Sequence, residues 1–286
     1  MVWHQNPRQP KYKPPIGSVD AHCHIFGPEA IFPYASERKY TPCTGSKEDL
    51  FTLRNTLGFS RNVIVQASCH GRDNSALIDG LEHAGNLARG IAVVDDTISD
   101  TELLSMNEVG VRGVRFNFVR RLVDPKPQAY YERIVEKIAP LGWHLIVYIE
   151  TADFNEQLPF LESLPVPVVF DHMARPDVAK GVEHADFSRF MHLMKSDKYW
   201  TKVSCPERLT QHGGSHQNYS DVIPFMKILV DTFPDRVLWG TDWPHPNMKS
   251  HMPDDGQLVE LIPLIADTEA KQKKLLVDNP MRLYWS

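Results

Sequence analysis

Residues 18–28 read SVDAHCHIFGP and contain two histidines, His22 and His24, in an otherwise largely apolar segment. Successive side chains of a β-strand point to opposite faces, so both imidazoles would project to one side and Cys23 to the other. Imidazoles can move a proton, polarise a carbonyl group or bind a metal. The alternative is a structural pair, with one histidine facing solvent and one hydrogen-bonded. The pair is therefore half of a candidate polar site whose other residues must come from elsewhere in the chain.

Apolar runs of strand length alternate with helical patterns along the chain. The predicted strands cover residues 18–26, 61–68, 90–95, 113–118, 144–150, 166–172, 200–205 and 236–243. The predicted helices cover residues 46–57, 73–85, 99–109, 128–141, 153–163, 184–196, 219–233 and segments from 255 to the end. Eight strand–helix units with continuously apolar strands predict an α/β fold, a single (β/α)8 TIM-like barrel over residues 1–286. The proline-rich residues 1–17 are expected to form an extended N-terminal arm on its surface.

The composition argues against several classes of protein. Of the 286 residues 42% are hydrophobic, enough for a sizeable core, yet no apolar run approaches a membrane span. The net charge of -5 provides no electrostatic footprint for nucleic acid or an anionic membrane. The polar N-terminus has no apolar signal core, which predicts a cytoplasmic protein. The four cysteines are scattered, so neither a disulfide framework nor a cysteine zinc site is expected.

In such a barrel, the residues at the carboxyl ends of the strands line the active face. Polar residues at or just after the predicted strand ends are His22, His24, Ser68, His70, Arg115, Asn117, Tyr148, Glu150, Asp171, His172, Asp242, His245 and Asn247. Each residue alone has a structural explanation. Their convergence on one face predicts a polar active site.

Arg115 lies inside the apolar run VRFNF. A buried guanidinium must be paired, because an isolated buried charge is very costly. Its partner is either a carboxylate of the protein or an anionic ligand, which the planar fork of arginine suits. Arg121, Arg175 and Arg208 follow strand ends and favour the ligand, although Arg208 could pair with its neighbour Glu207. Several arginines over one cleft of an acidic protein predict a substrate with more than one carboxylate.

Asp242 has the opposite charge and a different task. Beside three imidazoles an aspartate stays ionised, so it can accept a proton from water or bind a metal. The structural alternative is an aspartate that caps the turn into Trp243 and Pro244. The sequence has no G-x-S-x-G, phosphate-loop or H-E-x-x-H motif, so the chemistries of those motifs are not indicated.

The H-x-H segment, the Asp171-His172 pair and the stretch GTDWPHPN at residues 240–247 resemble the amidohydrolase superfamily. Within it, the chain resembles the family of 2-pyrone-4,6-dicarboxylate lactonases from Val19 to Trp285, most specifically in RKYTPC, GVRGVRFNF and KVSCPER. This resemblance implies a distorted barrel of the amidohydrolase type and a carboxylic ester hydrolase of aromatic and lignin catabolism. Such an enzyme opens the cyclic ester with water to 4-oxalomesaconate or its enol tautomer, 4-carboxy-2-hydroxymuconate.

The resemblance also implies roles for individual residues. Asp242 would be the general base that activates water, and His22, His24 and His172 would polarise the lactone carbonyl. The two carboxylates and the ring would be held by Tyr40, Ser68, Arg115, Arg121, Tyr148, Arg208 and Asn247. The expected partner is this small dicarboxylate lactone, with no nucleic acid and no membrane. A monomer and a small homo-oligomer are both compatible with the sequence.

Most of the superfamily hydrolyses through one or two metal ions, held by the H-x-H pair, later histidines and an aspartate on strand eight. This sequence departs from that pattern, because the fifth predicted strand ends in Tyr148 and Glu150, and His144 lies at its other end. No metal and no other cofactor is therefore expected. Hydrogen-bond donors would stabilise the oxyanion instead, at roughly 3 kcal/mol for each well-placed donor. A single zinc is the alternative, on His22, His24, His172 and Asp242.

Two other functions are also compatible with these residues. One is an amidohydrolase-type hydrolysis or decarboxylation of another carboxylated ring or sugar lactone. The other is a barrel that only binds a dicarboxylate. Asp242 beside three histidines argues against a pure binder, because binding alone needs no base.

Overall fold

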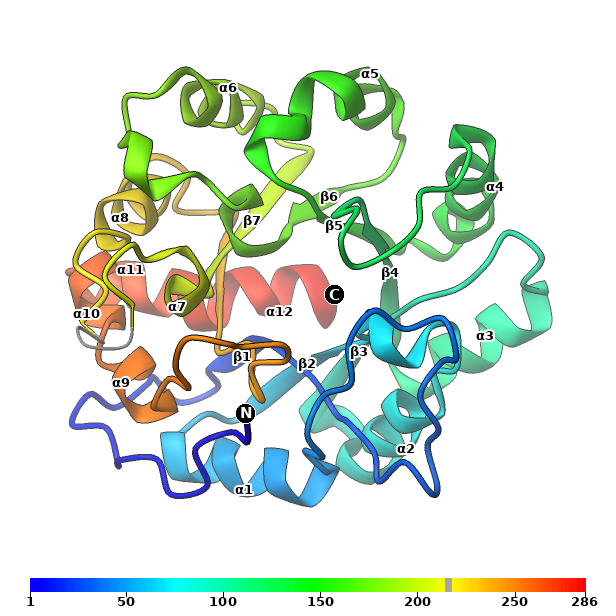
Figure 1. The fold of residues 1–286 in the computed structure, drawn as a ribbon, viewed down its shortest axis with the longest axis horizontal. Coiled ribbons are helices and arrows are strands. Elements are labelled where there is room, and N and C mark those ends of the chain that lie inside the picture. Colours follow the sequence, from blue (N-terminus) through cyan, green and yellow to red (C-terminus); the bar gives the residue numbers. More distant parts are fainter. Residues whose placement is uncertain (214–217) are drawn as a thin grey trace.

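The structure is a computed structural model that describes residues 1–213 and 218–286. Its centre is a parallel sheet of eight strands in chain order, with helices around the outside (Figure 1). The strands are β1 (Val19–Cys23), β2 (Arg61–Val65), β3 (Ala88–Ala92), β4 (Val111–Asn117), β5 (His144–Tyr148), β6 (Val168–Phe170), β7 (Tyr199–Ser204) and β8 (Val237–Gly240). A parallel bridge between Cys23 and Trp243 joins the two ends of the sheet. The predicted (β/α)8 barrel is confirmed.

Helices connect the strands and cover the barrel. The longer ones are α1 (Lys47–Leu57), α2 (Ser75–Ala84), α3 (Asp100–Val109), α4 (Gln128–Ile138), α5 (Phe154–Ser163), α6 (Ala185–Leu193) and α8 (Ile223–Thr232). The shorter ones are α7 (Pro206–Leu209), α9 (Asp255–Val259), α10 (Ile262–Ile265), α11 (Glu269–Lys273) and α12 (Asn279–Tyr284). Over the described residues, none of the helices combines the length and the apolarity that crossing a bilayer requires. The cytoplasmic location stays a prediction.

Helix α1 shows how the local sequence determines an element. The Ser46 hydroxyl accepts a hydrogen bond from the backbone N–H of Asp49, and the Asp49 carboxylate accepts one from the Ser46 backbone. This reciprocal pair is a capping box, here with aspartate where glutamate is usual. Gly58 ends the helix in the left-handed conformation, at φ 85°. Both ends of α1 agree with the sequence-based prediction.

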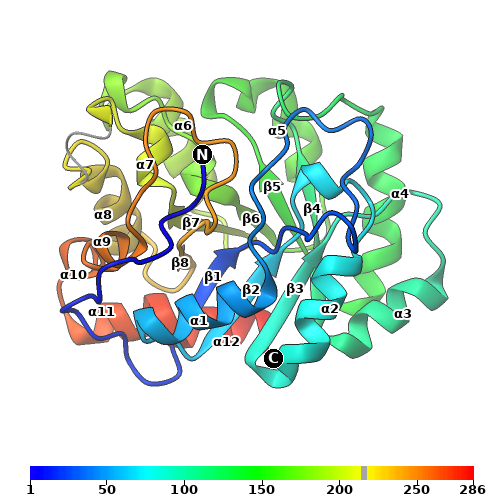
Figure 2. The same ribbon diagram turned by 60° about the horizontal axis from the view of Figure 1, so that its bottom comes forward.

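Apolar side chains fill the barrel below its carboxyl-terminal face. Val63, Ile91, Ile146 and Leu238 come from four different strands and pack in one buried cluster with Tyr284 of α12. Figure 2 shows α12 below the strands, on the side opposite the long loops. The catalytic candidates lie at the opposite end, although a buried polar residue, His144, also lies at the α12 end, where its ring centroid is 4.9 Å from that of Tyr284.

The N-terminal segment runs over the outside of the barrel (Figure 2). The backbone N–H and the guanidinium Nε of Arg8 both donate to the Asp254 carboxylate. A side chain on Gly256 would overlap the Arg8 carbonyl oxygen, so glycine is required for this approach. The indole of Trp3 packs edge-on against Trp243, with ring centroids 5.1 Å apart. The arm thus contacts the segment that directly follows Asp242.

Candidate active site

The barrel closes where the candidate residues lie. The backbone N–H of Asp242 donates to the carbonyl oxygen of His22, and that of His24 donates to the carbonyl oxygen of Trp243, both at 2.8 Å. A side chain on Gly240 would lie 2.6 Å from the Cβ of His22, so glycine lets β1 and β8 approach this closely. These contacts bring His24 and Asp242 together, although they are 218 residues apart in sequence.

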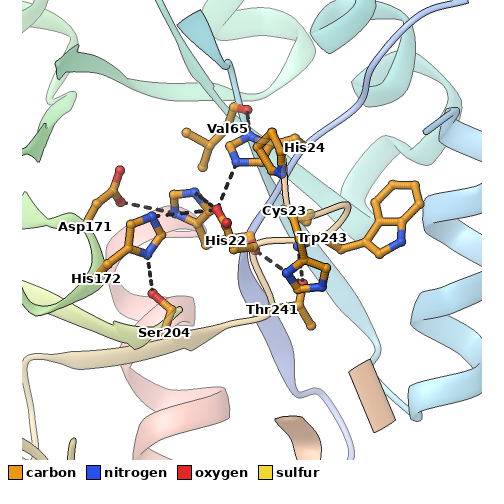
Figure 3. Close-up of polar contacts among 12 residues, drawn as sticks. His22, Cys23, His24, Val65, Asp171, His172, Ser204, Thr241 and Trp243 are labelled. Atoms are coloured by element: carbon orange, nitrogen blue, oxygen red, sulfur yellow. Dashed lines mark hydrogen bonds and ion pairs between the residues drawn. The ribbon is translucent and has the colours of Figure 1, made fainter. Parts of the chain in front are cut away.

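Three imidazoles surround one carboxylate oxygen, Asp242 Oδ1. The Nε2 atoms of His24, His22 and His172 lie 3.2, 3.4 and 3.7 Å from it. Figure 3 shows the three rings together at the ends of their strands. The structure therefore brings together the four residues for which the sequence predicted catalytic roles.

The other oxygen of Asp242 is held by Arg208. Its Nε and Nη2 donate to Asp242 Oδ2 at 3.0 and 2.8 Å. Burial alone would raise the pKa of Asp242, but the charge of Arg208 and the contact with His24 hold that pKa well below its usual range. Asp242 is therefore a carboxylate at neutral pH, with Oδ1 facing the imidazoles.

The second ring nitrogens of two histidines have partners that orient the rings. Nδ1 of His24 lies 2.7 Å from the carbonyl oxygen of Val65, which can only accept, so this nitrogen carries a proton. Nδ1 of His172 lies 2.7 Å from the Ser204 hydroxyl. Burial lowers the pKa of His172 to about 3, although Asp242 and Asp171 oppose this, so the ring is neutral.

A second layer of charges lies beneath the histidines. Asp171 Oδ2 accepts a hydrogen bond from Arg115 Nε at 2.8 Å, and Asp171 Oδ1 lies 3.1 Å from Lys202 Nζ. Lys202 Nζ is also hydrogen-bonded to His22 Nδ1 at 3.0 Å. The side chains of Lys202, Asp171 and His22 are fully inaccessible to solvent.

Sequence reasoning missed Lys202. It lies in the middle of β7, in the apolar-flanked run WTKVS, a pattern that predicts a buried strand rather than a site residue. Strand alternation places Lys202 and Ser204 on the same face of β7. Ser204 is the last residue of β7, at the active face. A lysine two positions earlier on the same face of the strand was therefore a signal for a buried cation near the site.

A cavity of about 570 Å³ lies at the carboxyl ends of the strands. This volume is in the range of small-molecule sites. Ten predicted site residues line it: His24, Tyr40, Ser68, Arg115, Arg121, Tyr148, His172, Arg208, Asp242 and Asn247. His22 does not line the cavity, because it is buried beside Asp242. From this position His22 does not contact a substrate carbonyl in the cavity, as the predicted polarising role would require.

The arginines at the cavity form ion pairs within the protein. The partner of Arg208 is not Glu207, the neighbour that the sequence suggested. Arg208 pairs with Asp242, whereas its closest approach to Glu207 is 3.9 Å. Arg121, with half of its side chain exposed, lies 3.3 Å from Glu150. A guanidinium has five N–H donors, so each arginine that donates to a carboxylate keeps donors for a second anion. Internal pairing and ligand binding are thus compatible at these positions.

Arg115 and Arg175 both contact the side chain of Tyr148. The Arg115 guanidinium is 4.8 Å from the centre of the Tyr148 ring. Arg175 Nη1 donates to the Tyr148 hydroxyl at 3.1 Å, and its Nε donates to Glu150 at 3.2 Å. Both arginines line the cavity, so it receives one cation from β4 and one from the segment after β6.

A second buried network, also missed from the sequence, supports this wall. His245 Nδ1 lies 3.3 Å from Glu207, and His245 Nε2 lies 3.0 Å from Asp255. Burial alone would lower the pKa of His245, but the two carboxylates raise it to about 10, so the ring is an imidazolium at neutral pH. The network joins α7, which carries Arg208, to α9. Nothing in the spacing of these residues predicts that they meet.

The donor set can be compared with what a metal ion needs. Nε2 of His22, Nε2 of His24 and an oxygen of Asp242 lie within 4.8 Å of one another. A histidine that binds zinc donates its other ring N–H to an acceptor. His24 does this toward Val65, whereas Nδ1 of His22 lies 3.0 Å from the amine of Lys202 and 3.1 Å from a carboxylate oxygen of Asp171. The fit of His22 to a metal ion therefore depends on whether its Nδ1 accepts from Lys202 or donates to Asp171.

Comparison with known proteins gives consistent matches over the whole chain. Residues 19–285 match the sequence profile of the family described as Amidohydrolase. The chain is 56% identical over 289 residues to 2-pyrone-4,6-dicarboxylate hydrolase of Comamonas testosteroni, covering 99% of this chain and 95% of that protein. It is 34% identical to 4-sulfomuconolactone hydrolase of Hydrogenophaga intermedia, covering 98% and 92% of the two chains.

A solved structure matches the fold as well. It is a probable 2-pyrone-4,6-dicarboxylic acid hydrolase from Acinetobacter baumannii with citric acid bound, 25% identical to this chain. The match covers 95% of this chain and 100% of that one, with a TM-score of 0.81. With its barrel, its H-x-H strand and these relatives, the protein belongs to the amidohydrolase family.

Proposed function

We propose that this protein is a lactonase that hydrolyses 2-pyrone-4,6-dicarboxylate. The observation that carries the proposal is the position of Asp242, an ionised aspartate among histidines, in a cavity also lined by Arg115, Arg121, Arg175 and Arg208. Arginine forks suit carboxylates, and this substrate has two of them. The substrate is also the one in the name of the 56% identical relative.

The reaction begins with water held between Asp242 and the lactone carbonyl carbon. Asp242 Oδ1 takes a proton from the water as its oxygen bonds to that carbon. The tetrahedral intermediate then collapses and breaks the ring C–O bond, and the proton on Asp242 passes to the leaving ring oxygen. The products are an enol, which can tautomerise to 4-oxalomesaconate, and a third carboxylic acid, which loses its proton to solvent.

His172 is the residue best placed to polarise the carbonyl. If the Ser204 hydroxyl donates to Nδ1, the proton of the neutral ring lies on Nε2, which faces the cavity side of Asp242. A buried donor aimed at the developing oxyanion lowers the activation barrier by roughly 3 kcal/mol. His24, which also lines the cavity, flanks the same oxygen of Asp242. His22 acts through Asp242 rather than through the substrate.

Polar side chains from different loops would hold the ring and its carboxylates. Tyr40, Ser68 and Asn247 line the cavity together with the arginines. Burial raises the pKa of Tyr40, so its phenol stays protonated and can donate a hydrogen bond at neutral pH. Tyr148 donates or accepts beside Arg175. These residues provide donors for an anionic, planar ligand.

The experiment that tests this function follows the loss of pyrone ultraviolet absorbance. Protein is treated with chelator, assayed for metals and added to 2-pyrone-4,6-dicarboxylate, with 4-sulfomuconolactone as the comparison substrate. We expect rapid turnover of the pyrone, a product heavier by one water, and a lower kcat/KM for the sulfonate. No turnover with or without zinc would overturn the substrate. Turnover only after zinc is added would overturn the metal-independent mechanism.

A further inference from the structure

We propose that Lys202 is a positioning residue that holds His22 in the tautomer with its proton on Nε2. In this tautomer the Nε2–H of His22 faces Asp242, 3.4 Å away, and Nε2 offers no lone pair to a metal ion. The consequence for the rate rests on the proposed lactonase function, whereas the tautomer and the metal affinity do not.

The contact between Lys202 and His22 defines which partner donates. Lys202 Nζ lies 3.0 Å from His22 Nδ1 in a fully buried site. The Asp171 carboxylate, 3.1 Å from Nζ, favours the ammonium form of Lys202, which has three donors and no acceptor, so Nδ1 presents its lone pair. A neutral imidazole with an unprotonated Nδ1 carries its proton on Nε2.

Asp171 is the competitor that would favour the opposite tautomer. Its Oδ1 lies 3.1 Å from His22 Nδ1, the arrangement in which a carboxylate accepts from a metal-binding histidine. Within the described part of the chain, however, Oδ1 of Asp171 has no hydrogen-bond partner of adequate geometry, whereas Lys202 does bond to Nδ1. The hydrogen-bond partner of His22 Nδ1 is therefore Lys202 and not Asp171.

The charges around Asp171 show that Lys202 is not needed to neutralise it. Arg115 already pairs with Asp171 through a 2.8 Å hydrogen bond. Removing the ammonium leaves one carboxylate and one guanidinium, a balanced pair. His22 Nδ1 would then be free to take a proton and donate it to Asp171.

The opposite tautomer would change what His22 does at the site. His22 Nε2 lies 3.4 Å from Asp242 Oδ1, a contact without hydrogen-bond geometry, so an N–H there faces the carboxylate with its positive end. With the proton on Nδ1, a lone pair would face Asp242 instead. His22, His24 and Asp242 would then offer three ligand atoms to one cation, since these atoms lie within 4.8 Å of one another. Lys202 thus keeps the proton of His22 on Nε2, and this proton prevents Nε2 from binding a cation.

The test compares Lys202→Met, which removes the donor, with Lys202→Gln, which keeps an N–H donor without the charge. Lys195→Met, on the exposed surface after α6, is the matched control. The tautomer of His22 is read from nitrogen-15 ring signals of histidine-labelled protein, assigned with His22→Asn. Zinc uptake is measured on dialysed protein, and kcat and KM are measured separately.

We expect the wild-type protein to show His22 with its proton on Nε2 and to retain no stoichiometric zinc. Lys202→Met should move the proton to Nδ1, take up zinc, and lower kcat about ten- to a hundredfold, the usual effect of losing such a partner. Lys202→Gln should keep the wild-type tautomer and much of kcat. A wild-type protein with the proton on Nδ1, or an unchanged tautomer in a folded Lys202→Met, would overturn the proposal. If Lys202→Met does not fold, the wild-type spectrum alone decides it.

Discussion

Arg208 donates two N–H groups to the same carboxylate oxygen of Asp242, Oδ2, at distances of 3.0 and 2.8 Å. The other oxygen, Oδ1, faces the imidazoles of His22, His24 and His172. Arg208 also lines the cavity, so a substrate carboxylate bound there would share its donors with Asp242. A weaker hold on Asp242 would make this carboxylate a stronger base as the substrate binds.

The substitution Arg208→Gln should shift the pH profile of kcat/KM. Arg208 is the strongest of the groups that lower the pKa of Asp242, so its removal raises that pKa. We expect the acid limb of the profile to move up by about one unit or more, the effect of a close opposite charge. Arg120→Gln is the control, because Arg120 pairs with Glu156 on the surface. An acid limb that stays in place would contradict the assignment of Asp242 as the base.

The substitution Asp242→Asn should abolish most of the turnover without unfolding the protein. Asparagine tolerates the left-handed backbone found at this position, φ 66°, and has nearly the same shape. Loss of a general base lowers kcat about 10²- to 10⁴-fold. Substrate binding, measured by calorimetry, should remain. Asp267→Asn, at an exposed ion pair, is the control, and wild-type kcat in Asp242→Asn would rule out the mechanism.

The stability of the protein should depend on the charge of His245 at alkaline pH. The pKa of His245 is raised to about 10 in the fold, from about 6.5 in an unfolded chain. The stabilisation is therefore complete below about pH 6.5 and is lost as the pH rises through 10. This shift corresponds to the order of 5 kcal/mol.

The measurement compares wild type with His245→Asn, since asparagine accepts the left-handed backbone at φ 56°. The free energy of unfolding is determined in urea between about pH 6 and pH 10.5. We expect the gap between the two proteins to narrow toward high pH. A gap that is constant over this range would show that His245 is not charged in the fold.

The substitution Gly256→Ala should detach the N-terminal arm. The added methyl group would overlap the Arg8 carbonyl oxygen, so the arm must move away from α9. Trypsin should then cut after Arg8 or Lys11 faster than in wild type, as followed by mass spectrometry. Gly181→Asn, at φ 78° where a side chain meets no neighbour and asparagine tolerates the left-handed backbone, is the comparison for a glycine remote from the arm. Equal cleavage in wild type and Gly256→Ala would show that the arm is not held by this contact.

The arrangement of elements could be predicted because it depends on local patterns. Apolar runs such as residues 144–150 and caps such as Ser46 are properties of a few consecutive residues. The H-x-H spacing likewise placed His22 and His24 on one side of a strand before any partner was known. Residues at strand ends then converge because a parallel barrel brings all carboxyl ends to one face.

The pairing of charges could not be predicted, because it depends on distances between remote segments. Arg208 pairs with Asp242 rather than with its sequence neighbour Glu207, since its side chain points into the barrel opening. His22 meets Lys202 across 180 positions of the chain. The sequence by itself determined the barrel, the family likeness and the candidate residues. Tertiary packing alone decided which nitrogen of each histidine faces a donor, because ring orientation follows from the partners that burial leaves within reach.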